Sequence, residues 1–168
     1  IFTSAEVPGW NVEWVKSDTV PYTPHFEENQ EDTYEGETRP EEAYLEIQDP
    51  VLDEGPDTAA DGEQYAELDS DWDGPEGDLT GEPANIAIWQ DIRTCPGKEY
   101  VLSYYWSPRA LEENSHLDVF WNGTVVDHHI ELGGTGAEEV YWRKESVVVT
   151  ATDWSTRVMF AEMGAADS

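Results

Sequence analysis

The second half of the sequence consists of short runs in which apolar and polar residues alternate. HLDVFW (116–121) is the clearest of them, with three apolar residues two positions apart: Leu117, Val119 and Trp121. A period of two places these side chains on one face of a β-strand. The pair Asn122-Gly123 follows directly, and both residues tolerate the positive φ of a type I′ turn. The sequence therefore predicts that TVVDHHI (124–130) folds back on 116–121 as a hairpin.

Similar runs recur along the chain at the spacing typical of antiparallel strands. Those of the second half are NIAIWQDI (85–92), YVLSYYW (100–106), VYWRKESVVVTA (140–151) and STRVMFAEM (155–163). The first half adds WNVEWV (10–15), AYLEIQ (43–48) and EQYAELD (63–69). About nine strands broken by turn residues, with few or no helices, predict an all-β, antiparallel β-sandwich or jelly roll.

The length and charge of the chain exclude several classes of protein. Its 168 residues predict a single domain. It carries 38 acidic and 8 basic residues, a formal charge of −30, which repels nucleic-acid phosphates and anionic membrane surfaces. No apolar run approaches the roughly 20 residues that cross a membrane, and a single cysteine, Cys95, rules out an internal disulfide. We therefore expect no nucleic-acid partner and no membrane insertion.

The acidic residues are concentrated in one part of the chain. Residues 27–82 hold 22 of them and a single base, Arg39. A solvated acidic surface is one interpretation, and bound cations are the other for a few of these side chains. Residues 17–42 form a long stretch with several prolines between predicted strands, which we interpret as an acidic insertion in the single domain 1–168.

A run in the second half, YVLSYYWSPRALEENSHLDVFWNGTVV, resembles a module of bacterial surface proteins. The shared pattern is a Y-x-L-S strand that leads into S-P-R, an acidic loop with Asn, and a strand that ends in W-N-G. VPGWNVE, DGEQYAELDS and STRVMFAEMGAADS resemble further parts of the same module, so the resemblance covers most of the chain outside 17–42. The family is the galactose-binding-like, DUF642-like group of calcium-dependent adhesins (repeats-in-toxin type) and cell-surface proteins.

The resemblance implies a galactose-binding-like jelly roll that is extracellular or displayed at the cell surface, often with bound Ca²⁺ and often with a glycan ligand. Members also have a strand at each end, resembling N-G-x-F-E and G-x-x-I-D-N-V, and this chain has neither. Because such end strands lie side by side, their absence predicts an open sheet edge. A strand-donating partner or a neighbouring domain would fill this edge, unless the strands were simply trimmed from the sequence.

The acidic loop LDSDWDGPEGD (68–78) carries the strongest metal-binding signal. Residues 69–74 match the DxDxDG pattern at the start of an EF-hand loop. Position twelve, however, is Thr80 instead of Glu, and no helices are predicted on either side of the loop. Alternating carboxylates still supply the hard oxygen ligands that Ca²⁺ prefers. A solvated turn whose Asp side chains cap backbone amides is the alternative. The predicted calcium ligands are Asp69, Asp71, Asp73, Asp78 and Glu82.

Aromatic residues and one arginine are the candidate glycan contacts. Trp72 lies between two of the aspartates, where an exposed indole would stack on a sugar ring while carboxylates accept its hydroxyl hydrogens; folding down as a lid on the sandwich is the alternative. Two further tryptophans flank the acidic insertion, and an arginine follows Ser107-Pro108, where it either fixes the loop or contacts ligand. The predicted ligand-binding residues are Trp72, Trp10, Trp14 and Arg109.

Other aromatic residues and histidines have simpler explanations. Trp89, Trp106 and Trp121 lie inside strand patterns and are expected in the core. His128 and His129 are neighbours in a strand, so they should point to opposite faces and not share an ion. The sequence contains no nucleophile elbow, no HExxH and no phosphate-binding glycine loop, so we do not predict an enzyme.

Taken together, the sequence predicts a non-catalytic, calcium-assisted carbohydrate-binding module of an extracellular adhesin or surface protein. The alternative is a structural or assembly module of a surface appendage, completed by a strand from another segment and with purely structural calcium. A polysaccharide-active enzyme on a jelly roll is the third hypothesis. The spacing of carboxylates does not test it, because 38 acids contain a suitable pair by chance.

Overall fold

The protein is an all-β chain. The computed structural model describes residues 2–15, 33–34, 37–48, 58–68, 85–108, 114–132 and 141–164. Every regular element in these ranges is a β-strand, and paired strands run antiparallel. The same ranges contain no helix that is long and apolar enough to cross a membrane. The all-β, antiparallel class expected from the alternating runs is confirmed.

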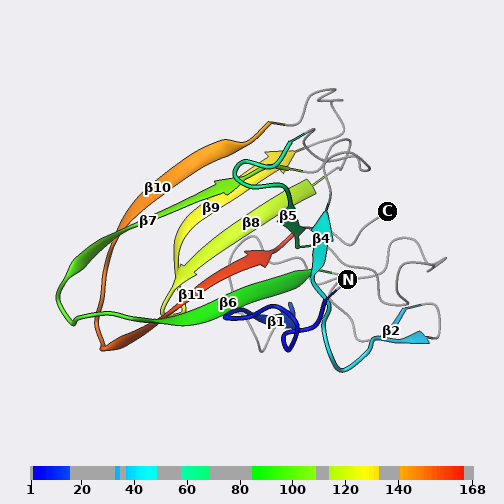
Figure 1. The fold of residues 1–168 in the computed structure, drawn as a ribbon, viewed down its shortest axis with the longest axis horizontal. Helices are drawn as coiled ribbons and strands as arrows, with labels where there is room; N and C mark the ends of the chain where they lie inside the picture. Colours follow the sequence, from blue (N-terminus) through cyan, green and yellow to red (C-terminus); the bar gives the residue numbers. More distant parts are fainter. Residues whose placement is uncertain are drawn as a thin grey trace.

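The larger sheet has five strands. In spatial order they are β1 (Asn11–Trp14), β6 (Ile86–Arg93), β11 (Ser155–Glu162), β8 (Asn114–Trp121) and β9 (Thr124–Leu132). Sequence neighbours are therefore not always spatial neighbours, since β11 inserts between β6 and β8. Figure 1 shows the long strands of this sheet side by side across the middle of the molecule.

A smaller layer covers part of this sheet. β7 (Glu99–Trp106) and β10 (Arg143–Thr150) pair along their whole length, and they arch together along the upper left of Figure 1. Trp121 of β8, Val158 of β11 and Val149 of β10 belong to one buried cluster. Apolar side chains of both layers thus pack face to face, which makes the arrangement β-sandwich-like.

Two pairs of very short strands complete the described structure. β4 (Glu46–Gln48) pairs with β5 (Tyr65–Glu67), and β2 (Thr33–Tyr34) pairs with β3 (Glu37–Thr38). The second pair falls inside the predicted insertion 17–42. Period-two alternation cannot be recognised over two residues, so this pair could not be predicted from the sequence.

The predicted hairpin is confirmed. Asn122 and Gly123 both have positive φ, 50° and 78°, and Trp121 faces Thr124 across the turn. Asn and Gly tolerate this backbone conformation better than other residues because they carry short polar or no side chains. The turn chemistry of these two residues therefore fixes where β8 ends and β9 begins.

The central strand β8 of the five-stranded sheet is buried on both faces, where the alternation predicted only one. Leu117 and Val119 pack toward β7 in a cluster with Trp106. On the opposite face Phe120 is 0% exposed and shares a cluster with Met159. Antiparallel strands alternate cleanly only when one face meets water, so the alternation of polar residues in HLDVFW did not reveal that the second face is covered.

The edge strand β1 is protected by a side chain. The Ser4 hydroxyl accepts a hydrogen bond from the Val12 N–H at 2.6 Å and donates one to the Val12 carbonyl at 3.1 Å. These two backbone groups would otherwise be open to a further strand. At this position the sheet edge is already closed within the chain.

Glu162, at the end of β11, joins two strands through its carboxyl group. Its Oε1 accepts hydrogen bonds from the backbone N–H groups of His116 at 2.7 Å and Gly164 at 3.1 Å. Although the residue as a whole is partly exposed, the carboxyl group is shielded from water. Burial therefore raises its pKa from 4.5 to about 8; the backbone hydrogen bonds oppose this increase, and the charge of Asp118 adds to it.

We expect Glu162→Gln to remove part of the pH dependence of stability. Between pH 4.5 and about 8 the unfolded chain loses the Glu162 proton while the folded chain keeps it, so stability falls as pH rises through this window. The loss is on the order of 5 kcal/mol. The amide keeps an oxygen for both N–H donors but does not ionise. Thermal unfolding at pH 5 to pH 9 measures the melting temperature. It should fall more steeply with pH for the native chain than for the variant.

Glu99→Gln is the matched control, because Glu99 is exposed at the start of β7. It should leave the slope of melting temperature against pH as it is in the native chain. Equal slopes for the native chain and Glu162→Gln would contradict the shielding of this carboxyl group.

Candidate functional site

A β-bulge in β9 turns two polar side chains toward the smaller layer. Val119 pairs with Asp127, and the next residue of β8, Phe120, pairs with Val125. Val126 of β9 is therefore an extra residue between the two pairs. Strict alternation from the turn would have pointed Asp127 and His129 to the opposite face. The bulge reverses this, so both lie on the face of Val119 that is turned toward β7. We call this the inner face of the sheet. Bulges commonly redirect side chains in this way next to functional sites.

These two residues form a hydrogen-bonded group with Tyr104 of β7. The Tyr104 hydroxyl donates to Asp127 Oδ2 at 2.7 Å and lies 2.7 Å from His129 Nε2. His129 Nε2 is 3.7 Å from the same Asp127 oxygen. Because the hydroxyl has one hydrogen and directs it at Asp127, the contact with His129 requires that Nε2 carry a hydrogen and donate it. The group links the smaller layer to the five-stranded sheet.

The surroundings keep Tyr104 and His129 uncharged near neutral pH. Burial raises the pKa of Tyr104 above its ordinary value of 10, and the hydrogen bond to Asp127 and the charge of that residue raise it further. Burial lowers the pKa of His129 below 6.5, while the nearby Asp127 charge opposes the decrease. A neutral hydroxyl and a neutral imidazole thus stand beside one carboxylate as hydrogen-bonding groups.

Five rings are connected through this group by successive ring contacts, and we call them the aromatic row. Its members, in spatial order, are Trp10, Phe160, Tyr104, His129 and Trp106. Successive ring centroids lie 6.2, 5.2, 5.8 and 4.6 Å apart. The last pair is stacked with an interplanar angle of 24°, and the others are tilted or edge-on. Such contacts each add to the stability of the inner face beyond burial alone.

The aromatic row continues outward through Arg143, the first residue of β10. Its guanidinium carbon lies 5.1 Å from the centre of the Trp106 ring and 5.3 Å from that of Tyr141. Both distances suit cation–π contacts. The Tyr141 side chain is 61% exposed, so this end of the row reaches the surface.

Within the described residues, the indole N–H of Trp106 has no acceptor. The residue is 6% exposed, and its Nε1 is buried with no hydrogen-bond partner in the described part of the chain. A buried donor left in this state costs roughly 1–3 kcal/mol. By contrast, the indole N–H of Trp121 donates to the Thr150 carbonyl at 3.0 Å.

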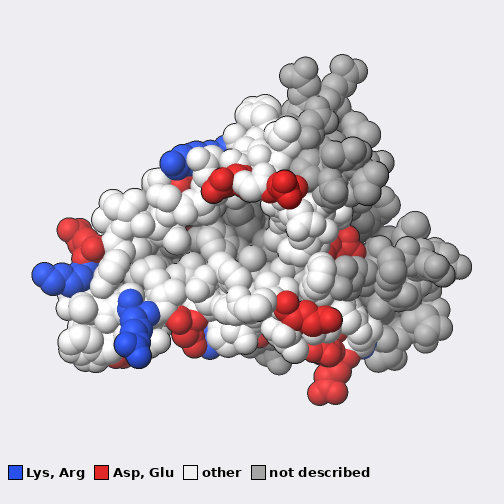
Figure 2. Space-filling model, in the orientation of Figure 1, with Lys and Arg blue, Asp and Glu red and all other residues white. Residues whose placement is uncertain are grey.

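The polar group of the site is in reach of water. The Asp127 side chain is 30% exposed and that of His129 13%. Figure 2 shows the face of the molecule hollowed near its middle, below the arch of β7 and β10. The inner face thus combines partly exposed hydrogen-bonding groups with aromatic surface, a composition typical of small-ligand sites.

The predicted calcium ligands lie outside the described residues, as do two of the predicted ligand contacts. These are Asp69, Asp71, Asp73, Asp78 and Glu82 for the metal, and Trp72 and Arg109 for the glycan. Within the described ranges, no three side chains of His, Cys, Asp or Glu gather as a metal site.

The other two predicted ligand contacts have different positions. Trp14 is 2% exposed, its indole N–H donates to the Pro40 carbonyl at 2.8 Å, and the Arg39 guanidinium lies 5.1 Å from its ring centre. This environment makes Trp14 a core residue covered from solvent. Trp10 is half-buried and begins the aromatic row beside Phe160.

The remaining histidines and tryptophans with predicted positions lie in β6, β7, β8 and β9. His129 lies on the inner face and His128 is exposed, so neighbours do point to opposite faces. Trp106 and Trp121 are each 6% exposed, as expected for core residues. Trp89 is half-buried beneath the Arg157 guanidinium, which is 3.3 Å from its ring centre.

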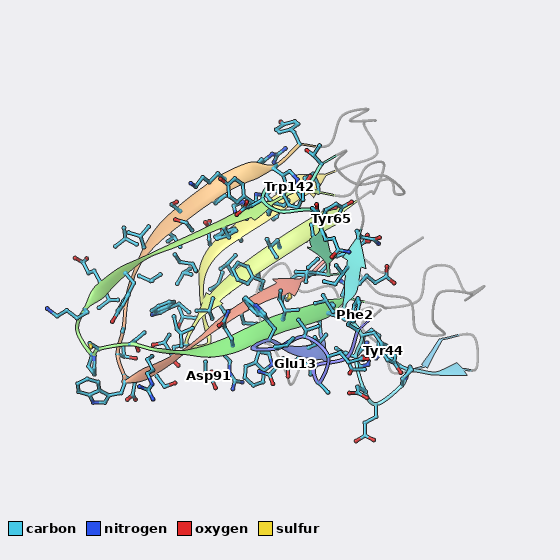
Figure 3. All side chains as sticks on the ribbon, viewed as in Figure 1. Phe2, Glu13, Tyr44, Tyr65, Asp91 and Trp142 are labelled. Carbon is cyan, nitrogen blue, oxygen red and sulfur yellow. The ribbon has the colours of Figure 1, made fainter. Side chains whose placement is uncertain are left out.

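A second aromatic contact ties β10 to the loop before β5. The Trp142 indole N–H donates to the Thr58 carbonyl at 2.6 Å, and its ring meets that of Tyr65 edge-on at 5.4 Å. Figure 3 shows Trp142 and Tyr65 beside one another at the upper end of the sheets. This contact positions the start of β10, and with it Arg143, next to Trp106.

Sequence reasoning missed Tyr104, Asp127 and His129 as a site. The available signal was a polar Asp-His-His run after two valines in TVVDHHI, which is unusual for a strand half-buried on one face. The bulge that brings the residues together has no signature in that run. Comparison of the chain with protein-family models, with curated proteins and with solved structures found no match.

We expect Asp127→Asn to lower the pKa of His129 further. The negative charge of Asp127 opposes the effect of burial on this imidazole, so its removal leaves burial less opposed. NMR titration of the histidine ring protons measures the shift, with His129→Gln used to assign the signal. A rise in the pKa of His129 in the variant would contradict the described geometry.

Proposed function

We propose that the chain is a non-catalytic carbohydrate-binding module whose ligand occupies the inner face beside Tyr104, Asp127 and His129. Sugars present hydroxyl groups around a ring with apolar C–H faces, so proteins bind them with hydrogen-bonding side chains next to aromatic rings. The inner face offers both, and the partial exposure of Asp127 and His129 gives a ligand access.

The observation that carries the proposal is the placement of the Tyr104–Asp127–His129 group within the aromatic row. A carboxylate accepts hydroxyl hydrogens, and an indole N–H donates to a hydroxyl oxygen. Asp127 and Trp106 supply one of each within the same cluster. The neutral states of Tyr104 and His129 suit recognition of an uncharged ligand.

The calcium-assisted and extracellular parts of the proposal depend on the sequence. They are supported by the DxDxDG loop at 69–74 and by the resemblance to calcium-dependent surface modules. We infer that the acidic loop holds Ca²⁺ and that the parent protein is an adhesin or surface protein.

The second candidate is an assembly module completed by a strand from a partner or a neighbouring domain. It is favoured by the outer face of β7 and β10, where Val101 is 68% and Val148 64% exposed opposite one another. Among the described strands, β7 and β10 pair only with each other, which leaves backbone groups at their outer edges for a further strand.

We expect Tyr104→Phe to weaken glycan binding at least tenfold. The change removes the hydroxyl that positions Asp127 and His129 but keeps the ring in the aromatic row. Tyr105→Phe is the matched control, because the neighbouring side chain lies on the outer face and is 45% exposed. A glycan array identifies the ligand, and titration calorimetry then compares the native chain with both variants.

Equal losses in the two variants, or no bound glycan on the array, would overturn the proposed site. Repeating the array with a chelator tests whether glycan binding depends on Ca²⁺. If the ligand still binds without Ca²⁺, the sugar site does not need the metal. No glycan but a large fall in melting temperature on chelation would favour the assembly module.

A further inference from the structure

The most exposed apolar side chains in the described part of the chain lie on and beside the smaller layer. The four most exposed of the large ones are Trp154 (70%), Val101 (68%), Val148 (64%) and Tyr141 (61%). Val101 and Val148 pair with one another across β7 and β10, and the other two flank β10 in the sequence. Apolar surface of this kind on a strongly charged protein is typical of a contact with another macromolecule.

We propose that two copies of this chain stack on one another through the outer face of β7 and β10, with their strands antiparallel. This contact is separate from the proposed glycan site, which lies on the inner face. The outer face consists of four cross-strand pairs of exposed side chains: Glu99–Thr150, Val101–Val148, Ser103–Ser146 and Tyr105–Lys144.

The outer face carries no net charge, which distinguishes it from the chain as a whole. Its eight side chains include one acid and one base, whereas the whole chain has 38 acids, 8 bases and a formal charge of −30. Two copies repel one another through this net charge. A face with balanced charge is therefore the surface through which they approach at the lowest electrostatic cost.

The two central rows of the outer face suit burial against a second copy. The Ser103 and Ser146 hydroxyl groups form a hydrogen bond with one another at 2.8 Å, which reduces the cost of removing them from water. The adjoining row, Val101 and Val148, is apolar and exposed. In the antiparallel arrangement the valine row of each copy lies over the serine row of the other. The short serine side chains leave room for the larger valines.

The charged ends make the outer face complementary to itself, which is why a second copy is the partner. Glu99 lies where β7 begins, and Lys144 lies at the opposite end, with its ammonium group 5.5 Å from the centre of the Tyr105 ring. A two-fold axis across the strands places Glu99 of each copy over Tyr105 of the other, beside its Lys144. Unlike charges thus meet at both ends of the contact. A different partner would have to supply a matching acid and base of its own.

The size of the outer face predicts a weak contact that depends on salt. Two paired strands of eight residues cover roughly 26 Å by 10 Å, which is small for a specific interface. We expect a dissociation constant on the order of 10–100 µM. Because the net charge opposes association, raising NaCl from about 0.05 to about 0.5 M should screen the repulsion and strengthen binding several-fold.

Sedimentation velocity at increasing protein concentration tests the contact. We expect the native chain to change from monomer to dimer. Val148→Lys should keep it monomeric because the variant buries a charge in the centre of the contact, even though the added base makes the net charge less negative. Ile130→Lys is the matched control, since Ile130 is 37% exposed on β9 of the other sheet, and its dimer should persist.

Exchanging the two end charges tests the antiparallel arrangement. Glu99→Lys and Lys144→Glu should each raise the dissociation constant about tenfold or more, because each brings like charges together at both ends. An equimolar mixture of the two variants should dimerise again, since unlike charges then meet at both ends. Both side chains are exposed, and an unchanged melting temperature of each variant checks that the fold is kept.

A native chain that stays monomeric at millimolar concentration in high salt would overturn the proposal and leave the outer face to a different partner. Equal dimerisation of the native chain and Val148→Lys would also overturn it, because the contact would then lie elsewhere. Failure of the mixture to restore a dimer that both single variants lack would contradict the antiparallel stacking. None of these results bears on glycan binding at the inner face, so the two proposals fail separately.

Discussion

The register between β8 and β9 is the constraint on which the inner face depends. Asn122 and Gly123 fix the turn, and the extra residue Val126 then reverses the direction of every side chain that follows it. Because a strand has a period of two, a shift of one residue exchanges its two faces completely. Asp127 and His129 meet Tyr104 only as a result of this shift, and their hydrogen bonds in turn hold the smaller layer against the five-stranded sheet.

Two of the side chains in the proposed binding site also pack between the layers. Phe160 and Tyr104 belong to the buried apolar clusters between the layers and are also members of the aromatic row. A ring in this position contributes apolar area to the core. The polar atoms of Tyr104 and Asp127 satisfy one another, which limits the cost of placing them at the edge of a core.

The charge of the chain is distributed unevenly along the sequence. The segment 27–82 contains 22 acidic residues and only one base, Arg39, which is 5% exposed and covers the ring of Trp14. Arg157 contacts Asp91 through two hydrogen bonds and lies on Trp89, so it too has structural contacts. Cations from solution are the natural complement of the acidic segment.

The sequence by itself determined the all-β class, most of the long strands, the hairpin at Asn122-Gly123 and the opposite directions of His128 and His129. These follow from local chemistry, namely period-two alternation and turn residues that tolerate positive φ. The tertiary structure alone decided the burial of Phe120 on the second face of the sheet, the core position of Trp14 and the cluster of Tyr104, Asp127 and His129. The first two depend on which distant segment covers a strand, and the third depends on one bulged residue. Neither cause produces a periodic pattern in the sequence.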